Sequence, residues 1–399
     1  MEKSRFASAL STRHDLEEAL AEVVAGVRQD LAGCRPDLLA VFATRHYGAP
    51  LAGIGPRLRE DTGAGAVVGC TGESIIGGQR EVEGQAGLAL WAAHLPGTRV
   101  QPFEVQAMQG PDRRPVFSPA PEPESAERSS VLLLVDPFRF PVDLYLRHLN
   151  QALPGVPVMG GLASGGESAG QNLLFTGAGL ASAGASGVLL EGEIELRSVV
   201  SQGCRPVGKP WVVTACDRNA IHKLGGRPAG DVLVETLNSL SPGDRELFRH
   251  GAFVGLAVDP TRSEFERGDF LVRVIVDMDQ TSRALLVTDM VRRGQTIQFL
   301  TRDAESAGED LEQLLRSQGG GELASPDEPW RAGALLFTCN GRGTRMFAVP
   351  DHDATCVRKG LAAEVPVAGF FAGGEIGPVG GQNFLHGFTA SVAIFRPRA

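Results

Sequence analysis

Two glycine-rich segments near the end of the chain contain side chains that could bind a small charged molecule. The first is the turn Asn-Gly-Arg-Gly at 340–343, which directly follows the apolar run ALLFTC. The second is AGGEIGPVGGQN at 372–383, which is followed by FLHGF. An arginine binds a carboxylate through two parallel hydrogen bonds, and a glutamate can accept a hydrogen bond from an amine. We therefore predict a ligand pocket formed by Asn340, Arg342, Gly374, Glu375, Asn383 and His386.

A third glycine-rich segment, GCTGESIIGG at 69–78, adds Gly72 and Glu73 to the predicted binding residues. Loops rich in glycine can turn several backbone N–H groups toward an anion. None of the three segments has the order of a nucleotide-binding P-loop or of a dinucleotide-binding G-x-G-x-x-G unit, so we expect no cofactor. Two structural roles stay open: the glycines could simply permit strand bends, and each glutamate could hold its own turn.

Cys339 offers a different chemistry. It ends the run ALLFTC close to Arg342, and a neighbouring positive charge favours the nucleophilic thiolate form of a cysteine. His386 or His352 would then act as the base. The sequence lacks a nucleophile-elbow motif, and an isolated cysteine in an apolar run usually acts as a small hydrophobic residue. We keep an enzyme that uses Cys339 and His386 as an alternative to a non-catalytic binding protein.

We expect no metal site. Asp351, His352 and Asp353 could ligate a metal, but one short cluster is more typical of a solvent-exposed loop. The six cysteines are scattered, without a C-x-x-C pair and without a histidine at zinc-ligand spacing. They indicate reduced thiols and a cytoplasmic protein.

The chain repeats itself. The segments that begin with Val156 and Val365 both read Val-Pro-Val-x-Gly, then Gly-Glu, then a glycine loop and Gln-Asn, and each follows an apolar strand-like run at 131–137 or 334–340. A fainter copy comprises 38–44 and 67–78. In all three copies a glycine precedes a glutamate, at Glu73, Glu167 and Glu375. Each copy is predicted to contain a strand, a helical or irregular segment, a strand, a glycine turn and a returning strand.

The pattern of apolar residues predicts a mixed α and β fold. An apolar stripe with helical spacing runs from Leu16 to Leu31, and further helices are predicted at 229–240 and 308–317. Residues 102–130 are rich in proline, serine and charge and are predicted to form an irregular, solvated insertion. We expect an N-terminal helix within 1–34 and two related α/β domains, 35–215 and 216–399, with mixed sheets and helices packed outside.

Composition excludes several kinds of partner. The 399 residues carry a formal net charge of −9 and contain no basic block, which argues against nucleic acid and anionic membranes. No apolar run approaches the about 18 residues that span a bilayer, and the charged N-terminus does not resemble a signal peptide. We therefore expect no membrane insertion.

The C-terminal segments resemble the FIST family, proteins of F-box and intracellular signal transduction. The resemblance rests on ALLFTCNGRG and the run from VPVAGFF to SVAIF, with weaker matches in GCTGESIIGG and VVSQGCRPVGKPWVVT, and covers 35–396. It implies paired FIST-N and FIST-C domains that act as sensory modules for small ligands such as amino acids. Some members carry an F-box or a bacterial signalling domain, and neither pattern occurs here.

Together these observations predict a non-catalytic sensory protein. Its ligand would be an amino acid or a similar carboxylate, held by the glycine-rich loops, with Arg342 on the carboxylate and Glu375 on the amine. The signalling protein that receives the signal stays unidentified. An adaptor protein without a small-molecule ligand is a third possibility.

Overall fold

The protein consists of two compact units. The computed structural model describes residues 3–110, 114–119, 121–181, 184–259, 262, 265, 268–319, 331–361 and 365–398. Unit 1 comprises Met1–Val200 and Leu311–Ala399, and unit 2 comprises Ser201–Asp310. The mixed α/β class predicted from the sequence is confirmed. The units do not follow the expected division into 35–215 and 216–399, because unit 2 interrupts unit 1.

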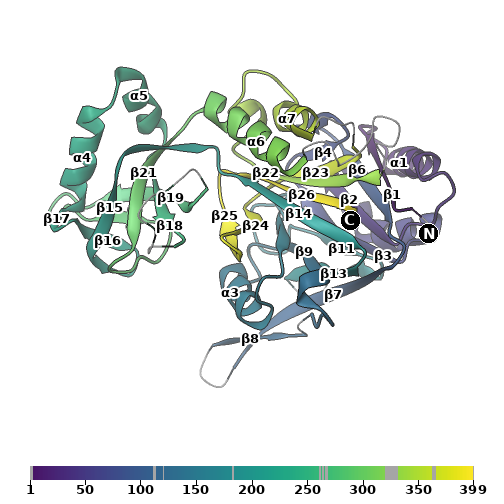
Figure 1. The fold of residues 1–399 in the computed structure, drawn as a ribbon. Helices are drawn as coiled ribbons and strands as arrows, with labels where there is room; N and C mark the ends of the chain where they lie inside the picture. The colour runs from purple at the N-terminus through teal and green to yellow at the C-terminus, as the bar shows by residue number, and fades with distance from the viewer. Residues whose placement is uncertain are drawn as a thin grey trace. The chain divides into compact units, whose positions relative to one another are not determined.

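Unit 1 contains three copies of one arrangement, a strand, a helix and four further strands (Figure 1). Copy 1 has β2 (Leu38–Thr44), α2 (Ile54–Thr62), β3 (Ala66–Gly72), β4 (Ile75–Gly77), β5 (Arg80–Val82) and β6 (Leu88–His94). Copy 2 has β9 (Ser129–Val135), α3 (Val142–Ala152), β10 (Val158–Leu162), β11 (Leu174–Thr176), β12 (Gly179–Leu180) and β13 (Ala185–Gly192). Copy 3 has β22 (Gly333–Cys339), α7 (His352–Leu361), β23 (Val367–Ala372), β24 (Glu375–Val379), β25 (Gln382–His386) and β26 (Ala390–Pro397). The three predicted repeats are thus confirmed, and all of them lie in unit 1.

The copies exchange their hairpins in a cycle. In each copy the first two strands are parallel, and the last strand returns antiparallel to the first. The intervening hairpin leaves its own copy: β4 pairs with β23 of copy 3, β11 with β3 of copy 1, and β24 with β10 of copy 2. Three sheets result. Sheet 1 has the order β1-β6-β2-β3-β11-β12, sheet 2 has β25-β24-β10-β9-β13-β7-β8, and sheet 3 has β14-β26-β22-β23-β4-β5.

One glycine in each copy fixes the approach of the parallel strands. Gly69, Gly160 and Gly369 lie opposite Val41, Leu133 and Leu336 on the neighbouring strand. A Cβ atom at these glycines would lie 2.0, 1.8 and 1.8 Å from the carbonyl oxygen opposite, far inside van der Waals contact. We call them the register glycines, because their positions relate the three copies residue by residue.

The apolar inner faces of the three sheets share one core. Phe42 of β2, Leu132 of β9 and Phe337 of β22 belong to the same buried cluster, and so do Trp91 and Phe370. Phe42 and Phe370, from sheets 1 and 3, stack with their ring centroids 5.2 Å apart. Burial of this apolar surface is the main force that holds the copies together.

Helices cover the outer faces of the sheets, as predicted. On sheet 1, α1 (Leu16–Asp30) and α2 contribute Val23, Val27 and Leu58 to a second apolar cluster. On sheet 2, α3 contributes Tyr145 and Leu149. On sheet 3, α6 (Ala304–Gly319) and α7 lie together (Figure 1) and contribute a fourth cluster, which contains Leu311, Leu315 and Val357.

Two regions of unit 1 differ from expectation. The predicted N-terminal helix is α1, but a strand, β1 (Arg5–Ser11), precedes it and pairs with β6. Much of the described part of 102–130 forms regular strands instead of an irregular insertion: β7 (Thr98–Gln109) pairs with β13, and β8 (Pro115–Ser118) pairs with β7. Its polar composition reflects exposed strands near the edge of a sheet, where many side chains face solvent. Sheet 3 also has an edge strand from outside the three copies, β14 (Ile194–Ser201), which lies next to β26.

Unit 2 contains a closed antiparallel sheet with two helices. The strands β15, β21, β18, β19, β20 and β16 pair in sequence, and β16 pairs again with β15, so the sheet has no open end there. An apolar cluster that includes Val254, Leu285 and Phe299 fills it. The elements of unit 2 are β15 (Cys204–Asp217), β16 (Ala220–Leu224), β17 (Arg227–Pro228), α4 (Ala229–Ser239), α5 (Pro242–His250), β18 (Phe253–Ala257), β19 (Phe270–Met278), β20 (Leu285–Val287) and β21 (Thr296–Arg302).

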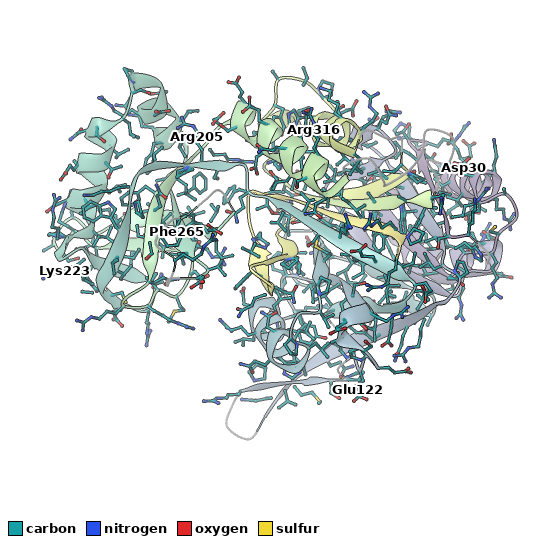
Figure 2. All side chains as sticks on the ribbon, viewed as in Figure 1. Asp30, Glu122, Arg205, Lys223, Phe265 and Arg316 are labelled. Carbon is teal, nitrogen blue, oxygen red and sulfur yellow. The ribbon has the colours of Figure 1, made fainter. Side chains whose placement is uncertain are left out.

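Both signs of charge are spread over the surface of each unit. Figure 2 labels examples, including Asp30 at the end of α1 and Arg316 on α6, both exposed. Many of the arginines pair with nearby acidic residues, as Arg316 pairs with Glu312. No helix in the described ranges is both long enough and apolar enough to cross a membrane.

Candidate functional site

The carboxyl ends of strands β3, β10 and β23 are linked by hydrogen bonds. Two residues after its register glycine, Thr71 accepts hydrogen bonds from the backbone N–H groups of Ser164 and Gly165, at 3.1 and 3.2 Å. The equivalent carbonyl in copy 2, that of Leu162, accepts one from Gly373 of copy 3 at 2.9 Å. The predicted glycine-rich loops of the three copies are therefore in direct contact.

Ser164 completes this arrangement with its side chain. Its hydroxyl accepts a hydrogen bond from the backbone N–H of Glu73 at 2.9 Å and donates one to the carbonyl of Phe371. In the other two places the equivalent N–H and carbonyl groups bond directly. The Ser164 hydroxyl therefore replaces the third direct bond between copies.

Replacing Ser164 with alanine is expected to lower the free energy of unfolding by about 1–3 kcal/mol, because it leaves one N–H and one carbonyl group without a partner. Urea denaturation measures the change. Ser168→Ala is the matched control, since Ser168 is exposed four residues later in the same loop. An unchanged stability in Ser164→Ala would show that the hydroxyl does not link the copies.

The three Gly-Glu pairs do not occupy equivalent positions. Glu375 begins β24 and lies opposite Gly161, the residue after a register glycine. The residue in the same place in copy 1 is Ile75, opposite Phe370. Glu73 and Glu167 lie in loops instead, and Glu167 is exposed. The apparent recurrence of Gly-Glu in the sequence therefore does not reflect one shared structural role.

Arg345, which the sequence analysis did not single out, joins two of the predicted residues. Its guanidinium forms an ion pair with Glu73, with one contact of 3.2 Å between Nη1 and Oε2. The same Nη1 donates to the backbone carbonyl of Asn340 at 2.9 Å. This places Glu73 of copy 1 beside Asn340 of copy 3. The only signal in the sequence is a second arginine three residues after Arg342.

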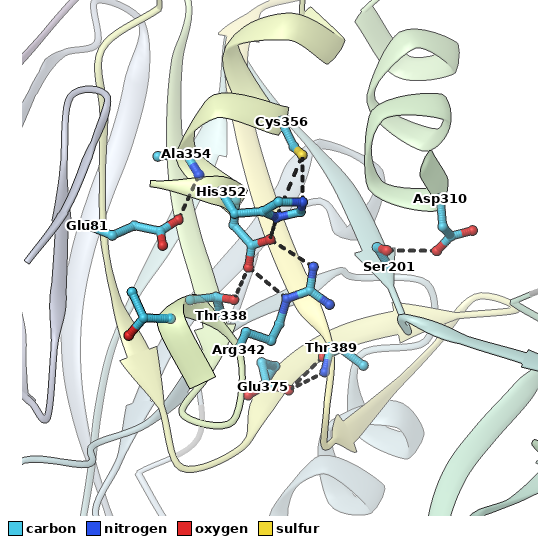
Figure 3. A network of polar contacts seen from close by, with 12 residues as sticks. Glu81, Ser201, Asp310, Thr338, Arg342, His352, Ala354, Cys356, Glu375 and Thr389 are labelled. Atoms are coloured by element: carbon cyan, nitrogen blue, oxygen red, sulfur yellow. Dashed lines mark hydrogen bonds and ion pairs between the residues drawn. The ribbon is translucent and has the colours of Figure 1, made fainter. Parts of the chain in front are cut away.

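Arg342 forms a buried ion pair with Asp353 (Figure 3). Its Nε lies 2.7 Å from Oδ2, and its Nη2 lies 2.8 Å from Oδ1. The side chains are 0% and 1% exposed. Asp353 also accepts hydrogen bonds from the hydroxyl of Thr338 and contacts Nδ1 of His352 at 2.9 Å. The two-pronged carboxylate contact predicted for Arg342 is thus made by a residue of the chain itself.

The charges of this pair stabilise each other. Burial alone would lower the pKa of Arg342, but the neighbouring Asp353 carboxylate outweighs it and raises that pKa. Burial alone would raise the pKa of Asp353, but Arg342 and the hydrogen bonds hold it well below its usual value. Both groups are therefore charged at neutral pH. The expectation that 351–353 form a solvent-exposed loop is wrong for Asp353, which lies buried in the first turn of α7.

Glu81 of the copy 1 hairpin covers the start of α7. Its Oε1 accepts the backbone N–H of Ala354 at 3.0 Å, and its own N–H donates to Asp351 at 2.6 Å. Burial, and next the charge of Asp353, raise the pKa of Glu81 to about 8. This shift favours the protonated form of Glu81 beside the charged Asp353 carboxylate.

Two buried polar atoms of the 340–343 turn have no hydrogen-bond partner in the described part of the chain. They are Nη1 of Arg342, a donor, and Oδ1 of Asn340, an acceptor. Because Nε and Nη2 face Asp353, Nη1 is directed away from that carboxylate (Figure 3). Buried groups of this kind are rare in folded proteins, and each calls for an explanation such as water, an ion or a ligand.

The other predicted pocket residues lie in two places. Glu375 accepts hydrogen bonds from the N–H and hydroxyl of Thr389, at 3.1 and 2.7 Å, and the Thr389 carbonyl accepts the N–H of Cys339. His386 lies opposite Glu375, and its Nε2 is 2.9 Å from the carbonyl of Gly377. Glu375 and His386 therefore belong to the surroundings of the 340–343 turn.

Asn383 is positioned elsewhere. Its side chain donates to Oδ1 of Asn150 on α3 and to the carbonyl of Val156, and it accepts the N–H of Val158. It is buried and ties the β24–β25 hairpin to copy 2. Both the amide oxygen and the amide nitrogen of Asn383 are therefore used in contacts within the protein.

The cysteines near the site differ in environment. The Cys339 thiol is near the guanidinium groups of Arg342 and Arg345. A negative charge on this thiol would raise the pKa of both arginines. Burial raises the pKa of the Cys356 thiol to about 12, although its sulfur lies 3.9 Å from the His352 ring. Cys356 is therefore a poor nucleophile. No described group of three or more His, Cys, Asp or Glu side chains could hold a metal ion.

Comparison with known proteins identifies the family. The FIST N domain matches residues 37–227, and the FIST C domain matches residues 229–378. The chain belongs to the FIST family. An uncharacterized protein of Mycobacterium tuberculosis, strain H37Rv, is 38% identical over 392 residues, which cover 98% of this chain and 99% of that protein. An uncharacterized protein of Mycobacterium bovis is 38% identical over 98% of both chains.

FIST domains are generally sensory domains of signal transduction. The FIST N match contains copies 1 and 2 and the first strands of unit 2, and the FIST C match contains the rest of unit 2 and the first four elements of copy 3. The 340–343 turn is therefore in the FIST C domain. Glu73, which pairs with Arg345, and Glu81, which contacts the start of α7, are in the FIST N domain.

Proposed function

We propose that this FIST protein is a non-catalytic sensory protein that binds a small carboxylate, with an amino acid as the simplest ligand, at the 340–343 turn. The observation that supports it is the pair of buried partnerless atoms, Nη1 of Arg342 and Oδ1 of Asn340. A ligand carboxylate would accept from the first, and a ligand ammonium group would donate to the second. Leaving both unsatisfied costs about 1–3 kcal/mol each, which ligand binding would recover.

The surrounding contacts keep the turn in place. Asp353 fixes the orientation of the Arg342 guanidinium, and Arg345 fixes the backbone of Asn340. A donor that is already oriented loses little entropy when it binds a ligand. Because Arg345 also pairs with Glu73, a ligand at the turn would affect the contact between copies 3 and 1. We propose that a partner protein reads this change.

A thermal-shift screen of amino acids at millimolar concentration tests the proposal. At least one should raise the melting temperature, because a ligand of the native state stabilises it. Asn340→Ala should abolish that shift and leave the ligand-free protein equally stable or up to about 1 kcal/mol more stable, since it removes a buried unpaired acceptor.

Asn238→Ala, in an exposed position of α4 in unit 2, is the matched control and should respond to the ligand like the unaltered protein. Two results would contradict the proposal: no amino acid raises the melting temperature, or Asn340→Ala keeps the full response. A large loss of ligand-free stability in Asn340→Ala would instead indicate a structural role for this side chain.

A further inference from the structure

Unit 1 contains a groove of about 560 Å³ far from the 340–343 turn. It lies at the amino end of β3, where Ala66 and Val67 contribute to its wall. The Glu73 loop follows the carboxyl end of the same strand, about 20 Å away at the usual rise of a strand. The groove has the size of an ordinary small-molecule site. The sequence analysis did not predict it, because its walls come from five separate parts of the chain, at 59–67, 101–104, 119–121, 176–178 and 186.

A close helix contact brings Arg59 to this groove. The α2 helix packs against the β11–β12 turn so tightly that a Cβ atom on Gly55 would lie 2.0 Å from the carbonyl oxygen of Thr176. Arg59 is one helical turn later on the same face. Its side chain lies beside Gly177, whose added Cβ would be 3.1 Å from the Arg59 Cδ. Arg59, Thr176 and Gly177 all line the groove.

The charges around the groove favour an anion. Arg59 forms no ion pair within the described residues, whereas Arg57, two positions earlier on α2, pairs with Asp61 and Glu17. The other charged residue of the lining, Glu104, already has an interaction partner. Arg59 is therefore the charged lining group available to a ligand, and its planar guanidinium suits an oxyanion.

Apolar rings form part of the remaining wall, beside the polar side chains of Gln101 and Thr176. Ring surfaces come from Pro102 and Phe103 of β7 and from Pro119 and Pro121 after β8. Ser186 of β13 also lines the groove. A partly apolar wall with one cation outside any described ion pair fits an amphipathic anion better than a sugar or a metal ion. We propose that this groove is a second binding site of the protein, for a small organic anion with a flat apolar body whose oxyanion binds Arg59.

Titration with the fluorescent dye anilinonaphthalene sulfonate, a flat apolar sulfonate, tests this proposal directly. The folded protein should bind about one dye per chain with a saturable rise in fluorescence. Arg59→Ala should lower the affinity for the dye by about five- to tenfold, because a charge-assisted hydrogen bond is lost. Arg57→Ala should leave dye affinity unchanged, since Arg57 is on the same helix but does not line the groove.

The dye also binds partly unfolded chains, so each variant is checked by circular dichroism and by its melting temperature. Ala178→Trp, at an exposed lining position, obstructs the groove without removing charge, and this second variant should also reduce binding. Equal dye affinity in Arg59→Ala and Arg57→Ala, or no saturable binding, would overturn the proposal. Asn340→Ala should keep dye binding, so this result is independent of the amino-acid screen.

Discussion

Replacing Asp353 with alanine is expected to lower the free energy of unfolding by about 3–5 kcal/mol, because it leaves the Arg342 guanidinium buried without its counter-charge. Arg342 is 0% exposed, so its charge is not stabilised by bulk water. Urea denaturation followed by circular dichroism measures the loss. The double variant Arg342→Met with Asp353→Leu should be more stable than Asp353→Ala, since it removes both buried charges.

Arg316→Ala is the control for this prediction. It removes an exposed ion pair with Glu312 and should change stability by less than about 1 kcal/mol. Acidic pH gives an independent test of the charge. Because the pKa of Asp353 is held below its usual value, its stabilising contribution is complete above that usual value and is lost as the pH falls through the folded-state pKa. Asp353→Ala should lack this acid-dependent component. A loss below about 1 kcal/mol in Asp353→Ala would contradict the assignment of the pair.

Gly369→Ala is expected to destabilise unit 1 by at least about 3 kcal/mol, at the upper end of the cost of overpacking. The added methyl carbon would lie 1.8 Å from the carbonyl oxygen of Leu336, so the parallel strands β22 and β23 would have to separate. Both strands are buried, and neither can move without disturbing the shared core. Denaturation in urea and the yield of folded protein measure the effect.

Gly53→Ala provides the matched control, because nothing lies within 4 Å of a Cβ atom placed there. Its stability should remain within about 0.5 kcal/mol of the unaltered protein. If Gly369→Ala were equally mild, the close approach of the strands would not constrain this position. Gly69 and Gly160 make the same approach in their own copies and should be comparably intolerant.

The repeated units could be predicted from the sequence because their physical cause is local. The Val-Pro-Val-x-Gly pattern ends in Gly160 and Gly369, and only glycine fits so close to the neighbouring carbonyl. The destination of each hairpin could not be predicted. A β4–β5 hairpin with the same alternation of residues could pair with its own copy or with copy 3, and only the packed core decides between them.

The sequence indicated some of the residues that the structure brings together. The residues of the 340–343 turn were identified by type, and the structure brings Asn340 next to Glu73 through Arg345. The partner of Arg342 was missed because Asp353 lies in a short polar run that is typical of exposed loops. Its burial follows from the position of α7 against sheet 3, which is a tertiary feature. The groove beside Arg59 has no sequence signature for the same reason.

The cyclic exchange of hairpins determines when the chain can acquire its final structure during synthesis. Translation proceeds from the N-terminus, and β4 finds its neighbour β23 only after Val367–Ala372 has been made. Until then the edge of β10 that receives β24 is also open. The nascent protein must therefore keep unpaired strand edges from aggregating over most of its synthesis. Unit 2 is encoded by one continuous stretch, so all its strands are available before the last copy emerges.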